Sequence, residues 1–190
     1  QKAVRARDVA DFEKMYRIIN NDPQNEILWV PAAAVKKIQK ARYAEMVLHE
    51  MWCVANLRIK SVEIQGDSAA VRFHNPESRI QFEHPWPRPM VTKDGHNSAF
   101  YLTNAMELLD EPGEWYHDIE SRKIYYYPRK GEKISKAVVP GIETLVWVEG
   151  TIDRPVKHIR FDNIAFQYTT WMRPSLQGHV PLQAGMYMTD

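Results

Sequence analysis

The amino-acid sequence predicts a mainly β protein, with antiparallel strands in its first two thirds and then a region of short strands joined by polar corners. Three observations support this prediction. Apolar and charged residues alternate between residues 57 and 73. Pro-Gly and Asn/Asp turn signals recur along the chain. The 12 prolines and 8 glycines suit extended segments and turns better than a helical bundle.

Composition defines the broad class of protein. The 190 residues are 44% hydrophobic and 26% charged, which is enough to form a core. The 25 basic and 24 acidic residues are well mixed, so we expect no nucleic-acid partner. No run approaches the ~18 apolar residues of a membrane helix, so we expect no membrane span. Cys53 is the only cysteine, which excludes an internal disulfide.

The first hundred residues contain most of the predicted strands. Residues 27–30 form a short apolar run that predicts a buried strand, and 32–43 have helix-compatible spacing. The next stretch is ambiguous, and we favour a strand from about residue 45. The alternating runs 57–64 and 69–73 predict antiparallel strands joined by a tight turn.

Turn chemistry organises the following segment. Three prolines around Trp86 predict an extended surface loop over 80–99, because proline cannot donate to a sheet ladder. A short helix is expected over 104–109. The tetrapeptide Glu111–Glu114 has proline second and glycine third, as in a type II turn. It leads into a hairpin with strands at 114–117 and 123–127.

The pattern changes after residue 138, where apolar residues at 145–148 and 156–166 predict short strands. Ile159 pairs with Phe161, and Ile164 with Phe166, around an Asp-Asn corner. A parallel β-helix needs such corners, because each rung bends around a shared apolar core. Only about one turn of such a helix is present, so the edge of a β-sandwich stays an open alternative.

The densest carboxylate cluster lies around the predicted hairpin. Glycoside hydrolysis uses a pair of carboxylates, one as acid and one as base or nucleophile. These acidic residues surround two turns, where Asp and Glu are common for structural reasons, and a structural role is therefore favoured. The members of the cluster are Asp110, Glu111, Glu114, Asp118 and Glu120.

Motifs for other chemistries are missing from the sequence. The seven histidines form no HExxH motif, so no metal site is indicated. The sequence also has no GxSxG, GxxxxGK[ST] or GxGxxG motif, and we expect no cofactor.

Four residues near the C-terminus are candidate carbohydrate contacts. Aromatic rings can stack on sugars, and Arg, His and Gln can hydrogen-bond sugar hydroxyls from loops on a rigid scaffold. The alternative is that the tryptophan caps the hydrophobic core. The candidate substrate-binding residues are Trp171, Arg173, His179 and Gln183.

Several motifs together resemble bacterial right-handed parallel β-helix proteins of the glycoside hydrolase type. The most specific is the run Leu-Asp-Glu-Pro-Gly-Glu-Trp-Tyr at 109–116. The others are Arg-Ala-Arg-Asp at 5–8, Trp52 before Leu-Arg-Ile at 57–59, Asn-Ala at 104–105, Tyr-Tyr-Tyr-Pro at 125–128, and the stretch 155–161.

The resemblance implies a layout and an activity. Residues 1–135 would form an inserted β-rich domain, and 136–190 the first rungs of a right-handed parallel β-helix. The protein would be a Bacteroidetes glycoside hydrolase acting on plant or host glycans, and it would be secreted, periplasmic or at the cell surface. Its catalytic carboxylates would project from later rungs, outside this chain, and both chain ends are interpreted as cuts through a longer protein.

Two rival functions stay open. One is a non-catalytic carbohydrate-binding or structural β-helix, and the other is a polysaccharide lyase. In each case the expected partner is a carbohydrate, and the sequence carries no signal for an oligomeric state.

Overall fold

The computed structural model describes residues 12–83, 86–170, 178–182 and 185–186. The chain divides into two compact units, one formed by Gln1–Glu132 with Arg173–Asp190 and the other by Lys133–Met172. The predicted division into an inserted domain and a β-helix at residue 135 stays a prediction.

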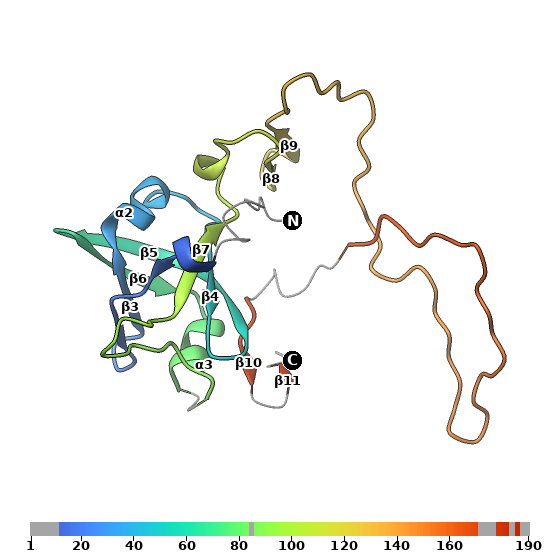
Figure 1. The fold of residues 1–190 in the computed structure, drawn as a ribbon, viewed down its shortest axis with the longest axis horizontal. Coiled ribbons are helices and arrows are strands. Elements are labelled where there is room, and N and C mark those ends of the chain that lie inside the picture. The colour runs from blue at the N-terminus through green and yellow to red at the C-terminus, as the bar shows by residue number, and fades with distance from the viewer. Residues whose placement is uncertain (1–11, 84–85, 171–177, 183–184, 187–190) are drawn as a thin grey trace. The chain divides into compact units, whose positions relative to one another are not determined.

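The first unit is built on a seven-stranded antiparallel sheet, and strands β3 to β7 of this sheet are labelled in Figure 1. The strand order is β1-β7-β4-β5-β6-β3-β2. The mainly β, antiparallel class predicted from the sequence is confirmed here. The strands of this sheet are β1 (Tyr16–Arg17), β2 (Asn20–Asp22), β3 (Ile27–Pro31), β4 (Glu45–His49), β5 (Val54–Gln65), β6 (Ser68–Phe73) and β7 (Ala99–Thr103). Two small hairpins follow, β8 (Trp115–Asp118) with β9 (Lys123–Tyr126), and β10 (Pro181–Leu182) with β11 (Gly185–Met186).

Helices are few and short in the described residues. They are η1 (Phe12–Lys14), α2 (Ala32–Val35), η2 (Lys36–Ile38), α3 (Glu77–Glu83) and η3 (Met106–Leu108).

Three of these helices correct details predicted from the sequence. The helix predicted over 32–43 ends at residue 38, and the one predicted over 104–109 is a single 3-10 turn. The predicted loop 80–99 was wrong at its start, because residues 80–83 belong to α3. Helix α3 begins directly after Pro76, a position that proline tolerates, and it buries Ile80.

The seven-stranded sheet curls so that its two edges meet. Its edge strands β1 and β2 are consecutive in the chain and are joined only by Ile18 and Ile19. The Ile18 N–H donates to the Ser98 carbonyl at 3.0 Å, and the Ile19 N–H donates to the Trp29 carbonyl at 2.6 Å. Ser98 directly precedes β7 and Trp29 lies in β3, so the two bonds join the two ends of the strand order. The sheet therefore closes around one core and leaves little of its edges exposed.

The long strand β5 holds the two halves of the sheet together. Its first half pairs with β4 and its second half with β6. Leu57 and Ile59 face the core two residues apart, but the next core residue is Val62, three positions later. A register shift between Ile59 and Ser61 accounts for this change, since a bulge adds one residue to a strand and bends it.

The core of the first unit is apolar and contiguous. Each strand from β3 to β7 contributes side chains, and α2 and η2 add Val35 and Ile38 from one side. The largest fully buried apolar side chains are Phe100, Ile18, Leu28, Ile38, Met46, Leu48 and Leu57.

A buried ion pair connects α3 to β5. The Glu77 side chain is only 1% exposed and accepts hydrogen bonds from Arg58 Nε at 2.6 Å and from Arg58 Nη2 at 2.9 Å. The backbone N–H of Arg58 also donates to Glu77, at 3.2 Å. This bidentate geometry compensates for removing the carboxylate from water.

The segment after residue 177 packs on this ion pair. Asn56 and His179 exchange two backbone hydrogen bonds of 2.8 Å. Gly178 has a φ of +70°, and a Cβ atom there would lie 2.7 Å from the Asn56 carbonyl oxygen and 2.8 Å from Glu77 Cδ. Only glycine fits both this conformation and this space.

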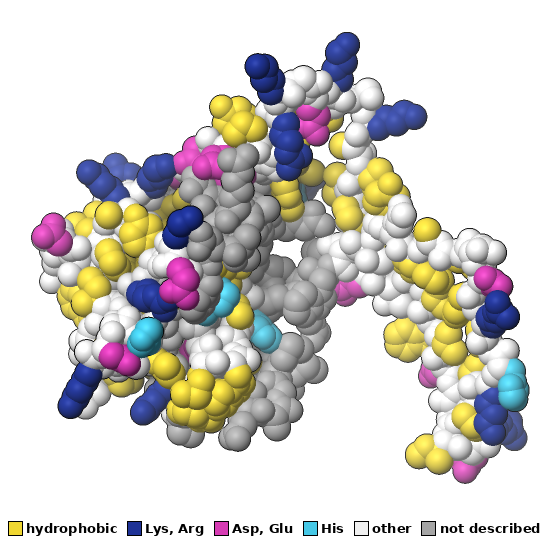
Figure 2. All heavy atoms as spheres, viewed as in Figure 1, with side chains coloured by type: hydrophobic (Ala, Val, Ile, Leu, Met, Phe, Trp, Pro, Cys, Tyr) yellow, Lys and Arg dark blue, Asp and Glu magenta, His cyan; other side chains and the backbone are white. Residues whose placement is uncertain are grey.

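The second unit has a different character. Its described residues, 133–170, form no helix or strand, whereas the sequence predicted strands at 145–148 and 156–166. Most of its apolar side chains are exposed, including Ile159 at 54%, and they lie open along this segment in Figure 2. The side chains of a solenoid rung are buried only by neighbouring rungs, so one rung alone cannot form a core. The β-helix stays a prediction.

Candidate functional site

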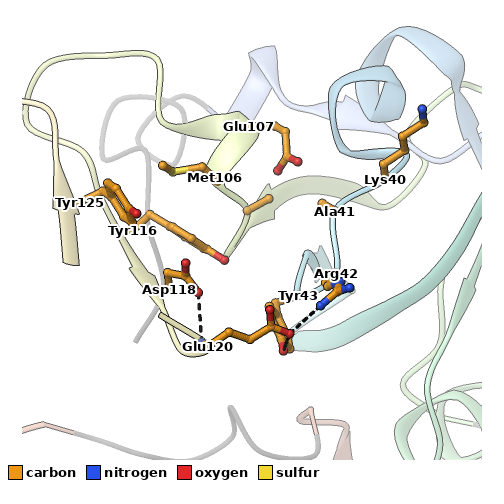
Figure 3. A pocket seen from close by; sticks show the side chains of 11 residues that line it. Lys40, Ala41, Arg42, Tyr43, Met106, Glu107, Tyr116, Asp118, Glu120 and Tyr125 are labelled. Carbon is orange, nitrogen blue, oxygen red and sulfur yellow. Dashed lines mark hydrogen bonds and ion pairs between the residues drawn. The ribbon is translucent and has the colours of Figure 1, made fainter. Parts of the chain in front are cut away.

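A pocket of about 290 Å³ lies in the first unit, between the β8–β9 hairpin, the segment that leads into β4, and η3 (Figure 3). Its volume is at the lower end of the range for small-ligand pockets. Its lining combines three tyrosines with charged groups of both signs. The lining residues are Lys40, Ala41, Arg42, Tyr43, Ala105, Met106, Glu107, Tyr116, Asp118, Glu120 and Tyr125.

The hairpin places two of the tyrosines side by side. Tyr116 on β8 lies directly opposite Tyr125 on β9 in the antiparallel register. Residues directly opposite each other point to the same face of a hairpin, so both rings face the pocket. Tyr126 is the next residue along β9 and therefore points to the other face, where its hydroxyl donates to Glu132.

Tyr116 is the most buried side chain of this pocket that carries a polar group directed into it. It is 8% exposed, and Figure 3 shows its hydroxyl near the middle of the pocket. That hydroxyl has no hydrogen-bond partner among the described residues. Burial raises the pKa of the phenol, and nearby Asp118 adds to the effect, so the hydroxyl keeps its proton and can donate a hydrogen bond.

Glu107 on η3 approaches the pocket from the opposite wall. Its carboxylate points towards the pocket in Figure 3, whereas the Lys40 amine points away. The Glu107 carboxylate accepts no hydrogen bond from the part of the chain that the structure describes. It is exposed, so its charge stays hydrated without a protein partner.

Glu120 ties the hairpin turn to the start of β4. Its Oε1 accepts hydrogen bonds from Arg42 Nη1 at 2.7 Å and from the Tyr43 hydroxyl at 2.9 Å. The hydrogen bond to Glu120 raises the pKa of the Tyr43 phenol. Asn104 anchors the same segment, because its side-chain amide donates to the Tyr43 carbonyl at 2.9 Å.

Asp118 is committed to the turn between β8 and β9. Its carboxylate accepts from the Ser121 hydroxyl at 2.7 Å and from the backbone N–H groups of Glu120 at 3.0 Å and Ser121 at 3.2 Å. These bonds, led by the one from the Ser121 hydroxyl, lower the pKa of Asp118. A carboxyl group with a lowered pKa is ionised at neutral pH and is therefore poorly suited to act as a general acid.

The rest of the carboxylate cluster is also engaged in structure. Glu114 is 5% exposed and accepts from the backbone N–H groups of Asp110 and Glu111, each at 2.9 Å. Asp110 accepts from the Lys37 ammonium group. Gly113 has a φ of +97°, and the Glu114 N–H donates to the Glu111 carbonyl, as in the predicted type II turn. These contacts agree with the structural role favoured for the cluster.

Another buried carboxyl group, that of Glu50, lies away from the pocket. Glu50 accepts from Gln81 Nε2 at 2.7 Å and from the Cys53 thiol at 3.3 Å. Burial is the main cause that raises the pKa of Glu50 from 4.5 to about 7. Burial, together with Glu50, raises the pKa of the Cys53 thiol to about 12, so this cysteine is a poor nucleophile.

The structure tests little of the predicted substrate-binding set. Trp171, Arg173 and Gln183 lie outside the described residues. His179 is half-buried, and its backbone pairs with Asn56. The role of these four residues in binding sugar stays a prediction.

The pocket tyrosines and Glu107 were not predicted from the sequence. A signal was available, because the predicted hairpin with a turn near 121 places Tyr116 across from Tyr125. The contribution of the segment 40–43 could not be found in this way, since it lies more than seventy residues earlier and reaches the hairpin only through the fold.

No group of three or more His, Cys, Asp or Glu side chains in the described ranges could hold a metal ion. Within those ranges, the chain forms no helix that is long and apolar enough to cross a membrane.

Together, the curled antiparallel sheet and its pocket of tyrosines and carboxylates define a β-rich domain with a polar pocket. The family model described as the GH141 insertion domain matches residues 1–129, which is most of the chain. The chain therefore belongs to the GH141 insertion domain family.

A solved structure named "Glycoside hydrolase" is similar to this chain. The two are 71% identical, with a TM-score of 0.89. The similarity covers 99% of this chain and 33% of that one, so this chain spans about a third of the length of the solved protein. No curated protein matches the chain. The predicted relationship to glycoside hydrolases is confirmed.

Proposed function

We propose that this chain is the scaffold region of a secreted glycoside hydrolase that cleaves O-glycosidic bonds in plant or host glycans. Membership of the GH141 insertion domain family and the similar solved structure support the hydrolase class. The scaffold role is supported by the carboxylates around the hairpin. Four of them are engaged in turn hydrogen bonds or ion pairs.

Hydrolysis of a glycosidic bond needs one carboxyl group to protonate the leaving oxygen and another to act as base or nucleophile. Asp118 is held ionised by its turn, and Glu120 is occupied by Arg42 and Tyr43. Glu114 caps the preceding turn. The catalytic pair is therefore assigned to parts of a longer protein outside this chain.

The segment 136–190 is proposed to begin a right-handed parallel β-helix. Its exposed apolar residues support this proposal, because Ile159, Phe161, Ile164 and Phe166 would be buried if further rungs stacked on them. Asn163 adds support with a φ of 55°, a left-handed conformation that asparagine tolerates and that turns a chain sharply.

A secreted, periplasmic or cell-surface location is part of the proposal. Its support is chemical, since polymeric glycans lie outside the cell and an enzyme that cleaves them must reach them there.

The test compares the longer protein with this 190-residue chain on a panel of plant and host glycans, with product analysis. We expect hydrolysis by the longer protein and none by this chain. Activity in this chain would contradict the scaffold role and make Asp110, Glu111, Glu114 and Asp118 the first residues to substitute.

The same panel separates the rival functions. Products that absorb as unsaturated uronates would show a lyase and contradict hydrolysis. Binding of glycans by the longer protein without any cleavage would show a non-catalytic module.

A further inference from the structure

The pocket beside the β8–β9 hairpin has features that a structural role does not require. Tyr116 is 8% exposed, yet its hydroxyl points into the pocket and has no hydrogen-bond partner among the described residues. The hydroxyl is not one of the fully buried polar atoms, so this tip of a buried side chain is open to the pocket. It is therefore available to donate a hydrogen bond to a ligand or to accept one.

The shape of the pocket suits a small ring with apolar and polar faces. Tyr116 and Tyr125 lie side by side on one wall, and Tyr43 contributes to another. A tyrosine offers an apolar ring face and a polar tip, which matches a sugar, whose C–H groups gather on one face and whose hydroxyls lie around its edge.

The charges of the pocket define the class of sugar. Glu107, Asp118 and Glu120 contribute carboxylates, which accept hydrogen bonds when ionised. Arg42 and Glu120 neutralise each other and the Lys40 amine points away, so Glu107 and Asp118 give the pocket an excess of negative charge. Such a surface favours a ligand rich in hydroxyl donors and repels uronates and sulfated sugars.

We infer that this pocket is a non-catalytic binding site for one residue of a neutral sugar, with the Tyr116 hydroxyl and the Glu107 carboxylate as its principal hydrogen-bonding groups. The inference rests on the proposed function in that a hydrolase region would meet glycans. The site adds a second point at which the protein holds its substrate, away from the catalytic carboxylates, and such a linkage raises the effective concentration of a polymer at the enzyme.

The test measures binding of neutral monosaccharides, such as glucose, galactose and xylose, to this 190-residue chain by titration calorimetry and ligand-detected NMR. Galacturonic acid is the charged comparison for galactose. We expect saturable binding of at least one neutral sugar and weaker binding of the uronate.

Two conservative variants test the named groups. Tyr116→Phe removes only the hydroxyl, and Glu107→Gln removes the charge. Tyr116→Phe should weaken binding roughly three- to tenfold, the effect expected for one lost hydrogen bond. Glu107→Gln keeps an acceptor oxygen but makes the hydrogen bond neutral, and should weaken binding by a similar factor. Tyr126→Phe is the matched control, because it removes a hydroxyl from the other face of the same hairpin, and it should leave binding unchanged. Thermal melting of each variant establishes that it is folded.

Three results would overturn the inference. They are no saturable binding of any neutral sugar, tighter binding of galacturonic acid than of galactose, and equal binding by wild type and Tyr116→Phe. Hydrolysis by the longer protein is read in a separate assay. Hydrolysis by the longer protein, together with no sugar binding by this chain, would leave the proposed function intact and contradict only the inferred sugar site.

Discussion

The two units of this chain have similar apolar patterns but different structures. In the first, alternating apolar residues of β5 pair with β4 on one side and β6 on the other, and Leu57 is 0% exposed. In the second, residues 133–170 carry comparable apolar residues, yet Ile159 is 54% exposed and no strand forms in the described part. An apolar pattern specifies a strand only where partner strands are present to bury it.

The largest expected effect comes from truncating one apolar side chain in each unit to alanine. Leu57→Ala should lower the free energy of unfolding by about 3 kcal/mol, because it leaves a cavity in the core. Ile159→Ala, in the second unit, should change it by less than about 0.5 kcal/mol, since little burial is lost. Urea unfolding followed by tryptophan fluorescence measures both. Equal effects of the two substitutions would contradict the difference in side-chain burial between the two units.

Within the first unit, the ion pair between β5 and α3 is expected to contribute more to stability than an exposed ion pair on α3. Glu77→Ala should destabilise the protein by about 3 kcal/mol, because the partly buried guanidinium group of Arg58 loses its carboxylate partner. Arg79→Ala breaks the exposed pair with Glu83 on the same helix and should cost less than about 0.5 kcal/mol. Urea unfolding of the two variants side by side is the measurement, and a small effect of Glu77→Ala would show that the pair contributes little to holding α3.

A smaller and pH-dependent effect is expected at Glu50. Its pKa is raised from 4.5 to about 7 in the folded protein, so the folded state holds the proton more tightly than the unfolded chain. The free energy of unfolding should therefore fall as pH rises through this window and then level off. The total loss is at most about 3 kcal/mol.

Glu50→Gln tests this assignment, because the amide keeps an acceptor for Gln81 and cannot titrate. The variant should gain stability relative to wild type as pH increases from 4.5 to about 7. A difference between the two proteins that stays constant across that range would contradict the raised pKa.

The sequence predicted the local parts of this fold well. Strand β3 was expected from its short apolar run, β4 was favoured within an ambiguous stretch, and the β8–β9 hairpin was expected from its turn residues. The bulge in β5 and the meeting of β1 with β7 could not be expected, since each depends on residues distant in the sequence.

In the candidate site too, contacts between residues close in the sequence were predictable and contacts between distant residues were not. The turn role of Asp118 follows from local chemistry, and the structure shows it directly. The pocket, in contrast, forms where Tyr43 meets a hairpin more than seventy residues later through Glu120. Helix α3 was not predicted. The loop predicted from Pro85, Pro87 and Pro89 was extended too far towards the N-terminus and covered the last turn of this helix.

The central claim is that the second unit requires partner strands from a longer protein. Hydrogen exchange measured by mass spectrometry on this chain and on the longer protein tests the claim most directly. We expect amides at 145–148 and 156–166 to exchange rapidly in this chain and slowly in the longer protein, while β4 and β5 are protected in both. Rapid exchange of those segments in both proteins would contradict the claim.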